Sequence, residues 1–173
     1  MTVPNPISAV VGIGSNIRPE RHVPAVYALL EQRFHVTASS PVYRSPAVGM
    51  PPGTGDFLNL AVELEWSGSL FELKGALESV EDLMGRRRSD TSAWVSRTVD
   101  LDILTAGDLS GSVGAFEVPH PDIEVFAHTA VPLTDLAGER IHPRLGVSYG
   151  EIAAGLDTSA LVRIGALTED GNG

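Results

Sequence analysis

The 173-residue chain is long enough for one domain with a substantial core, and its 43% hydrophobic content argues against intrinsic disorder. Its formal net charge of −10, with a single lysine among 12 basic residues, excludes a general attraction to nucleic acid or to an anionic membrane surface. Without a membrane-spanning apolar run, a basic signal-peptide region or any cysteine, we expect a cytoplasmic protein that has no disulfides and no thiolate metal sites.

The first part of the chain alternates strand and helix patterns. Residues 7–13 form an apolar run rich in valine and isoleucine, which predicts a buried strand. Apolar residues at helical spacing over 23–34 predict a helix with proline in its first turn, and residues 36–43 predict a second strand. Residues 45–55 carry six prolines and glycines, so we expect a long mobile loop, of a length that is often functional.

The next strand and helix have clearer signals. Residues 57–66 alternate in hydrophobicity, a strand pattern that aims Phe57 and Asn59 together at the face away from the apolar stripe. A capping-box sequence begins at Ser69, and apolar residues at intervals of three and four continue the predicted helix up to Gly85. Its last turns are acidic, the wrong sign for a helix C-terminus, so we expect the arginines at 86–88 to lie close by.

Two carboxylates interrupt the following apolar strand, predicted over residues 98–104. Because successive strand residues point to opposite faces, Asp100 and Asp102 share one face, with Cα atoms roughly 7 Å apart. Such a pair is costly to bury unless a divalent cation or an arginine neutralises it, and Mg²⁺ prefers one or two carboxylates together with water and substrate phosphates. The pair indicates phosphoryl chemistry; the alternative is an edge strand whose acids face water and pair loosely with upstream arginines.

After this strand the patterns weaken. Short helices are predicted near residues 122–126 and 148–154, and a final strand over 161–164. The order strand, helix, strand, strand, helix, strand is that of an α+β ferredoxin-like βαββαβ sandwich, an antiparallel sheet with helices on one face and C-terminal additions. The chain shows no repeat or linker, so we expect a single domain over residues 1–173.

Several short motifs occur together in an informative order. They are Ile13-Gly14-Ser15-Asn16, Tyr43-Arg44-Ser45-Pro46, Phe57-Leu58-Asn59, Gly85-Arg86, residues 97–102 and Val118-Pro119-His120-Pro121. Over roughly residues 7–155 the chain thereby resembles the 6-hydroxymethyl-7,8-dihydropterin pyrophosphokinases of folate biosynthesis, and residues 156–173 are a C-terminal extension. The resemblance implies a ferredoxin-like enzyme that uses ATP and two Mg²⁺ ions to transfer pyrophosphate to the pterin hydroxymethyl group, giving AMP. Its partners would be these small molecules, and we expect a monomer.

The resemblance also implies roles on the phosphate side of the site. Asp100 and Asp102 match the metal ligands, and Asp100 would also be catalytic if it accepts the hydroxyl proton, directly or through water. The matches to ATP-binding residues are Glu78, Glu81, Arg86, Arg88, Arg97, Ile103 and His120. Among these, Arg86 and Arg97 match the catalytic arginines that hold the phosphates and stabilise charge during transfer.

On the pterin side, the matching residues are Ser45, Pro46, Val48, Phe57, Asn59, Trp94, Phe126 and His128. An amide suits the mixed donors and acceptors of a pterin edge, and an aromatic face suits its flat ring. Trp94 and Arg88 lie in the loop that closes over the site in relatives. Phe126 and His128 depart from the family pattern, since they stand where relatives have an arginine and a second stacking aromatic.

Two other functions are compatible with this pattern. One is a non-catalytic relative that binds nucleotide or pterin, and the other is a pyrophosphokinase with a different acceptor alcohol. Arg97, Asp100 and Asp102 argue against a protein that only binds, because such a protein gains nothing from adjacent buried charges.

Overall fold

The computed structural model describes residues 5–85 and 98–167, and its centre is a six-stranded antiparallel sheet. The strands are β1 (Ile7–Ser15), β2 (His35–Ser39), β3 (Val42–Ser45), β4 (Phe57–Trp66), β5 (Asp100–Ala106) and β8 (Val162–Gly165). Their order is β5-β1-β4-β3-β8. Strand β3 pairs with the first half of β4, and β2 pairs with the second half of the same edge of β4. The longest strands, β1 and β4, are therefore neighbours at the centre, and β5 forms one edge.

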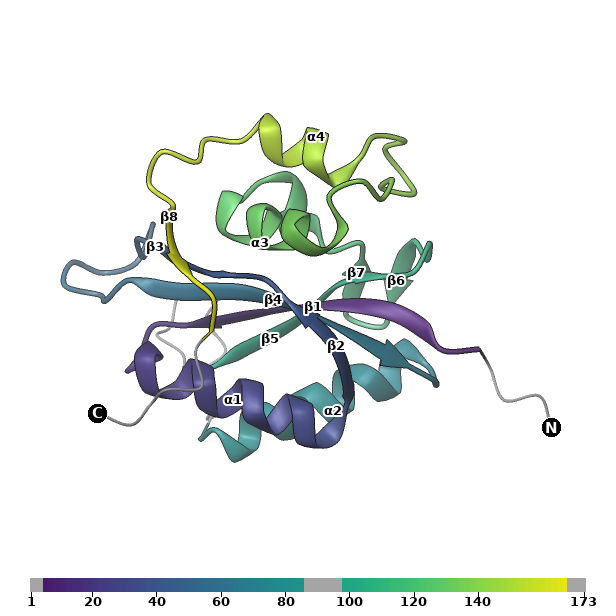
Figure 1. Ribbon diagram of the computed structural model, residues 1–173, viewed down its shortest axis with the longest axis horizontal. Helices are drawn as coiled ribbons and strands as arrows, with labels where there is room; N and C mark the ends of the chain where they lie inside the picture. Colours follow the sequence, from purple (N-terminus) through teal and green to yellow (C-terminus); the bar gives the residue numbers. More distant parts are fainter. Residues whose placement is uncertain (1–4, 86–97, 168–173) are drawn as a thin grey trace.

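Helices cover both faces of the sheet (Figure 1). Helices α1 (Pro19–Arg33) and α2 (Leu70–Leu83) lie on one face, and α3 (Ala127–Ala137) and α4 (Tyr149–Ala154) lie on the other. A hairpin of β6 (Gly111–Val113) and β7 (Phe116–Val118), followed by the 3-10 helix η1 (Pro121–Glu124), connects β5 to α3. The ferredoxin-like α+β fold is confirmed: α1 and α2 lie on one face of the sheet, and the expected C-terminal additions form a second layer on the other face.

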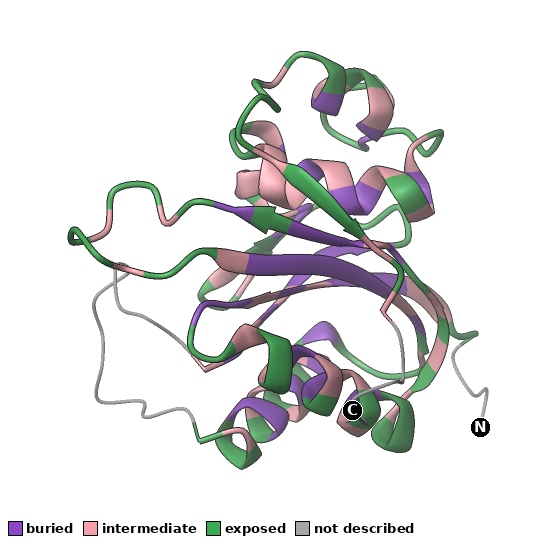
Figure 2. Cartoon of the chain, turned by 60° about the vertical axis from the view of Figure 1, so that its left-hand side comes forward, coloured by how far each residue is buried: buried purple, intermediate pink, exposed green. Residues whose placement is uncertain are grey.

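Strand β1 has an apolar sequence because it is buried from both sides. Val11 and Ile13 pack in the core beneath α1 and α2, whereas Val10 packs with Leu104 and Leu133 in a smaller core beneath α3 and α4. Figure 2 shows the buried central stretches of the strands between the two helical layers. Burial of both faces removes the alternation that marks a strand with one exposed face, and it explains the continuous apolar run.

The clearest local predictions are confirmed. Ser69 caps α2: its Oγ accepts from the Glu72 backbone N–H at 3.2 Å, and Glu72 Oε2 accepts from the Ser69 N–H at 2.8 Å. The predicted strands at 7–13 and 57–66 are β1 and β4, and the predicted short elements near 148–154 and 161–164 are α4 and β8. In the described part of the chain, no helix has the length and hydropathy needed to cross a bilayer.

Two predictions are wrong. The single strand expected over 36–43 is two strands, because Ser40 and Pro41 interrupt the ladder: the Ala61 N–H of β4 donates to Ser40 Oγ at 2.8 Å instead of to a backbone carbonyl, and proline has no N–H to donate. The second is that no helix was predicted between residues 126 and 148, where α3 spans 11 residues. Pro132 suggested a break there, although the buried Ala130, Leu133 and Ala137 are at helical spacing.

Candidate active site

A cavity of about 570 Å³ opens on the α3 side of the sheet, beyond the part that α3 and α4 cover. Its floor is formed by residues that share a face of the strands: Gly12 and Gly14 of β1, Asn59 of β4, and Asp102 and Leu104 of β5. A side chain at Gly14 would reach to within 3.6 Å of Asn59 Oδ1, so the two glycines leave the floor open. The cavity therefore exists because β1 lacks side chains at the point where both neighbouring strands carry polar ones.

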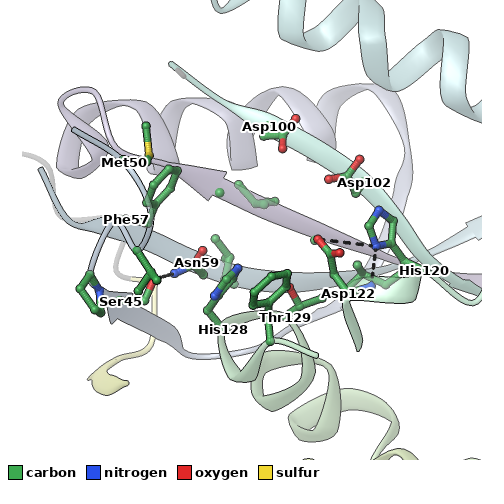
Figure 3. A pocket seen from close by; sticks show the side chains of 18 residues that line it. Ser45, Met50, Phe57, Asn59, Asp100, Asp102, His120, Asp122, His128 and Thr129 are labelled. Atoms are coloured by element: carbon green, nitrogen blue, oxygen red, sulfur yellow. Dashed lines mark hydrogen bonds and ion pairs between the residues drawn. The ribbon is translucent and has the colours of Figure 1, made fainter. Parts of the chain in front are cut away.

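One end of the cavity is acidic (Figure 3). Asp100 and Asp102 point into it from β5, and His120 and Asp122 approach from the segment that starts η1. The two β5 aspartates are half-buried rather than buried, and the Asp102 side chain is 36% exposed. The cost of burying this pair is therefore smaller than the sequence argument from adjacent buried charges assumes, because bulk water reaches both carboxylates.

The backbone of η1 orients His120. Its Nδ1 accepts from the Asp122 backbone N–H at 3.2 Å and lies 3.9 Å from Asp122 Oδ2. An imidazole nitrogen that accepts this bond carries no proton of its own, so the neutral ring has its proton on Nε2. His120 can then offer an N–H donor to the cavity beside the carboxylates.

The other end of the cavity combines an amide with aromatic rings. The Asn59 amide nitrogen donates to Ser45 Oγ at 2.9 Å and approaches Tyr43 O at 3.5 Å, so its donors are occupied and Oδ1 is turned toward Gly14 and the cavity. Phe57 lies beside it on the same face of β4 (Figure 3). This arrangement presents an acceptor and an aromatic face to a ligand.

The opposite wall is formed where α3 begins. The rings of Phe126 and His128 stack on each other, with centroids 5.2 Å apart and planes at 22°. Burial lowers the pKa of His128 below its usual value, and the nearby Asp122 carboxylate offsets part of that effect. His128 is therefore neutral at pH 7 and offers an uncharged ring.

The cavity gathers most of the residues predicted for the pterin and for the metal. It is lined by Ser45, Pro46, Val48, Phe57, Asn59, Asp100, Asp102, His120, Phe126 and His128. Glu78, Glu81 and Ile103 do not line it: Ile103 packs in the core on the opposite face, and Glu81 is buried with Oε1 accepting from the Leu101 N–H at 2.8 Å. Arg86, Arg88, Trp94 and Arg97 lie outside the described residues.

Met50, Asp122 and Thr129 are among the lining residues that the sequence did not single out. Asp122 follows His120 by two residues, but an acid in the first turn of a helix has a local explanation that hid its position in the site. Thr129 follows His128 at the start of α3, a helix that was not predicted. Met50 lies in the loop between β3 and β4, where spacing gives no information on direction.

The carboxylates suit Mg²⁺ bound together with a phosphate substrate. Within residues 5–85 and 98–167, no group of three or more histidine, cysteine or acidic side chains is arranged to hold a metal. Mg²⁺ usually takes only one or two carboxylates and completes its shell with water and substrate phosphates, so Asp100 and Asp102 are sufficient. The Lys74 ammonium lies 3.4 Å from Asp102 Oδ1, which shows that the site accommodates a positive charge at this carboxylate.

Comparisons with known proteins agree with this geometry. A family model described as 7,8-dihydro-6-hydroxymethylpterin-pyrophosphokinase matches residues 10–138. A 2-amino-4-hydroxy-6-hydroxymethyldihydropteridine pyrophosphokinase of Synechocystis sp. is 33% identical over 156 residues, which cover 88% of this chain and 78% of that protein. The Bacillus subtilis protein of the same name is 34% identical over 131 residues, covering 74% of this chain and 77% of that one.

Solved structures show the same fold. A Plasmodium falciparum HPPK-DHPS variant crystallised with pterin and p-hydroxybenzoate superposes with a TM-score of 0.72 at 11% identity. The match covers 94% of this chain and 48% of that one, so the chain spans about half the length of that protein. At this identity the likeness concerns the fold alone.

Proposed function

Because this chain belongs to the 7,8-dihydro-6-hydroxymethylpterin-pyrophosphokinase family and is thus a diphosphotransferase of folate biosynthesis, we propose that it transfers pyrophosphate from ATP to 6-hydroxymethyl-7,8-dihydropterin. The acceptor would be the hydroxymethyl oxygen, and AMP would leave. One observation carries the proposal: a single cavity contains a carboxylate pair on β5 at one end, and the amide of Asn59 on β4 with nearby aromatic rings at the other end. Chemistry on a phosphate and recognition of a flat heterocycle need these two ends.

The amide and aromatic end would hold the pterin. Asn59 Oδ1 can accept from the N–H groups on the heterocycle edge, while Phe57 covers one face of the ring. The Phe126–His128 pair lies across the cavity and would cover the other face. Ser45, Pro46 and Val48 line the approach to this end, as the resemblance implied.

The acidic end would bind the triphosphate through Mg²⁺. We assign Asp100 and Asp102 as the ligands, and the bound cation would neutralise phosphate oxygens that gain charge during transfer. His120 Nε2–H would donate to a phosphate oxygen. Arg86, Arg88 and Arg97 keep the ATP assignments implied by the resemblance, and Trp94 keeps its pterin assignment. The resemblance also implies ATP contacts for Glu78, Glu81 and Ile103, whose side chains lie outside this cavity.

The transfer step is a displacement at the β-phosphorus. The pterin hydroxymethyl oxygen forms a bond to that phosphorus, the bond to the oxygen bridging toward the α-phosphorus breaks, and AMP leaves with the electron pair. The hydroxyl proton passes to Asp100 or to water. Holding the two substrates at adjacent ends of one cavity supplies the alignment that this step requires.

A direct assay tests the proposal against its alternatives. The purified protein is incubated with ATP, Mg²⁺ and hydroxymethyldihydropterin, and we expect equal amounts of AMP and pterin pyrophosphate. Omission of the pterin is the control for simple ATP hydrolysis. Pterin binding without AMP would favour the non-catalytic relative, and AMP formed only with another alcohol would favour a different acceptor.

A further inference from the structure

Lys74, the only lysine in the chain, connects α2 to the acidic end of the cavity. It lies on the helix that covers the opposite face of the sheet (Figure 1). Because its ammonium contacts Asp102, which faces the cavity, the side chain extends past the edge strand β5. The ammonium is 3.4 Å from Asp102 Oδ1 and donates to Leu101 O at 3.2 Å. The Lys74 side chain is 23% exposed, so bulk water screens this contact less than it would screen a surface pair.

Helix α2 also fixes the backbone between the two aspartates. Leu101 lies between Asp100 and Asp102 on the edge strand β5, and its N–H and C=O both bond to side chains of α2 instead of to β1. Glu81 Oε1 accepts from the Leu101 N–H at 2.8 Å, and Lys74 donates to the Leu101 carbonyl. Two α2 side chains thus supply the hydrogen bonds that a neighbouring strand would otherwise provide.

We propose that Lys74 is a positioning residue that holds the Asp102 carboxylate in the free enzyme and weakens its hold on a divalent cation. The inference rests on the proposed function, in which Asp102 binds that cation. Two cations at one carboxylate repel each other, so the incoming ion displaces the ammonium from Oδ1. Lys74 has three donors on a flexible stem and can keep its bond to Leu101 O while releasing the carboxylate.

The single lysine makes this exchange observable without any mutation. In protein labelled with ¹⁵N-lysine, the side-chain ammonium signal can come only from Lys74. We expect addition of Mg²⁺ to move that signal, because the ammonium loses its carboxylate partner, and we expect no movement in Asp102→Asn. A signal that stays unchanged as Mg²⁺ saturates the wild-type protein overturns the proposal.

Binding of Mn²⁺ alone, followed by electron paramagnetic resonance, gives the magnitude. Lys74→Met keeps the length of the side chain and removes the charge, so the dissociation constant for Mn²⁺ is expected to fall about three- to tenfold. Lys74→Arg keeps the charge and should stay within about twofold of wild type. Arg33→Met, at the exposed end of α1, removes an equal charge elsewhere and should leave binding unchanged.

The variants separate failure of this inference from failure of the proposed function. If Asp102→Asn abolishes Mn²⁺ binding while Lys74→Met binds no more tightly than wild type, Lys74 has no such role and the metal assignment stands. If Asp102→Asn binds as wild type does, the cation does not use Asp102, and both the assignment and the role of Lys74 are wrong. Thermal unfolding of each variant shows whether the fold is retained.

Discussion

On the face of the sheet toward α1 and α2, β1 and β5 place Val11, Ile13 and Leu101 in a closed apolar core. On the opposite face the same strands place Gly14 and Asp102 along an open cavity. The two faces are made of alternate residues, so one residue packs in the core and its neighbour in the chain lines the cavity. Packing of the first face, together with the smaller core beneath α3 and α4, holds the strands in place where the cavity leaves the second face unpacked.

The largest expected effect comes from the open face. Asp102→Asn removes a charge but little volume, and we expect kcat/KM to fall about a thousandfold or more because phosphate charge goes uncompensated. The thermal unfolding temperature should change little, since Asp102 is half-buried and outside the closed core. Steady-state kinetics and calorimetry measure the two quantities. A large loss of stability would mean that the faces are not separate.

The adjacent residue tests the closed face. Leu101→Ala should lower the free energy of unfolding by about 2–5 kcal/mol, because Leu101 is fully buried and its removal leaves a cavity. Chemical denaturation measures that loss. We expect the folded fraction to keep a comparable affinity for pterin, measured by titration calorimetry. Denaturation at the wild-type midpoint would contradict the assignment of stability to this face.

A methyl group on the cavity floor should have a smaller effect, confined to binding. In Gly14→Ala the new Cβ would lie 3.6 Å from Asn59 Oδ1 and 4.0 Å from Phe57, ordinary contacts that the fold can accept. The same methyl would occupy space beneath the pterin, so we expect its affinity to fall roughly tenfold at nearly unchanged stability. Unaltered pterin binding would indicate that the ligand does not reach the floor.

The smallest expected effect is a pH dependence at His128. Because burial lowers its pKa in the folded protein, the unfolded chain binds the proton first as pH falls. His128 therefore favours folding above its unfolded pKa of about 6.5, and this contribution is lost as pH decreases below that value. His128→Phe should flatten the decline of unfolding temperature between neutral and mildly acidic pH; an identical decline in both proteins would contradict this.

The lowered pKa of His128 also bears on binding of the pterin. An exposed histidine would become charged near its unperturbed pKa of about 6.5, and a pterin stacked on it would bind with a pH dependence there. Because burial lowers the pKa of His128, its ring becomes charged only under more acidic conditions, and pterin affinity should stay constant around neutral pH. Affinity titrations in a series of buffers measure this. Phe57→Ala should weaken binding at every pH.

Local patterns predicted the elements whose signals are complete within a short segment. The alternation of β4, the Ser69 capping box and the shared face of Asp100 and Asp102 depend on neighbours within four residues, and the structure contains all three. Helix α3 was missed because Pro132 suggests a break, although Ala130, Leu133 and Ala137 are buried at helical spacing. Packing against the sheet stabilises a helix that contains proline, and that packing is a tertiary property that spacing alone does not contain.

The candidate site shows the same division. The motifs predicted which residues meet at the cavity. The contact of Lys74 with Asp102 joins residues 28 positions apart in the chain, and it depends on the packing of α2 next to the edge strand β5. The open floor likewise depends on Gly14 lying opposite Asn59 in the β1–β4 register. Such pairings follow from the topology of the sheet, and no local pattern records them.

The hydrogen bonds to the outer edge of β5 also affect the solubility of the folded chain. An edge strand with open backbone groups is a template on which another molecule can add a strand, which leads to aggregation. Here the groups of Leu101 are occupied by Glu81 and Lys74, and Leu104 O accepts from the His120 N–H at 2.8 Å. The side chains that steady the aspartates thus also block strand addition, and truncating Glu81 would expose the protein to intermolecular sheet growth.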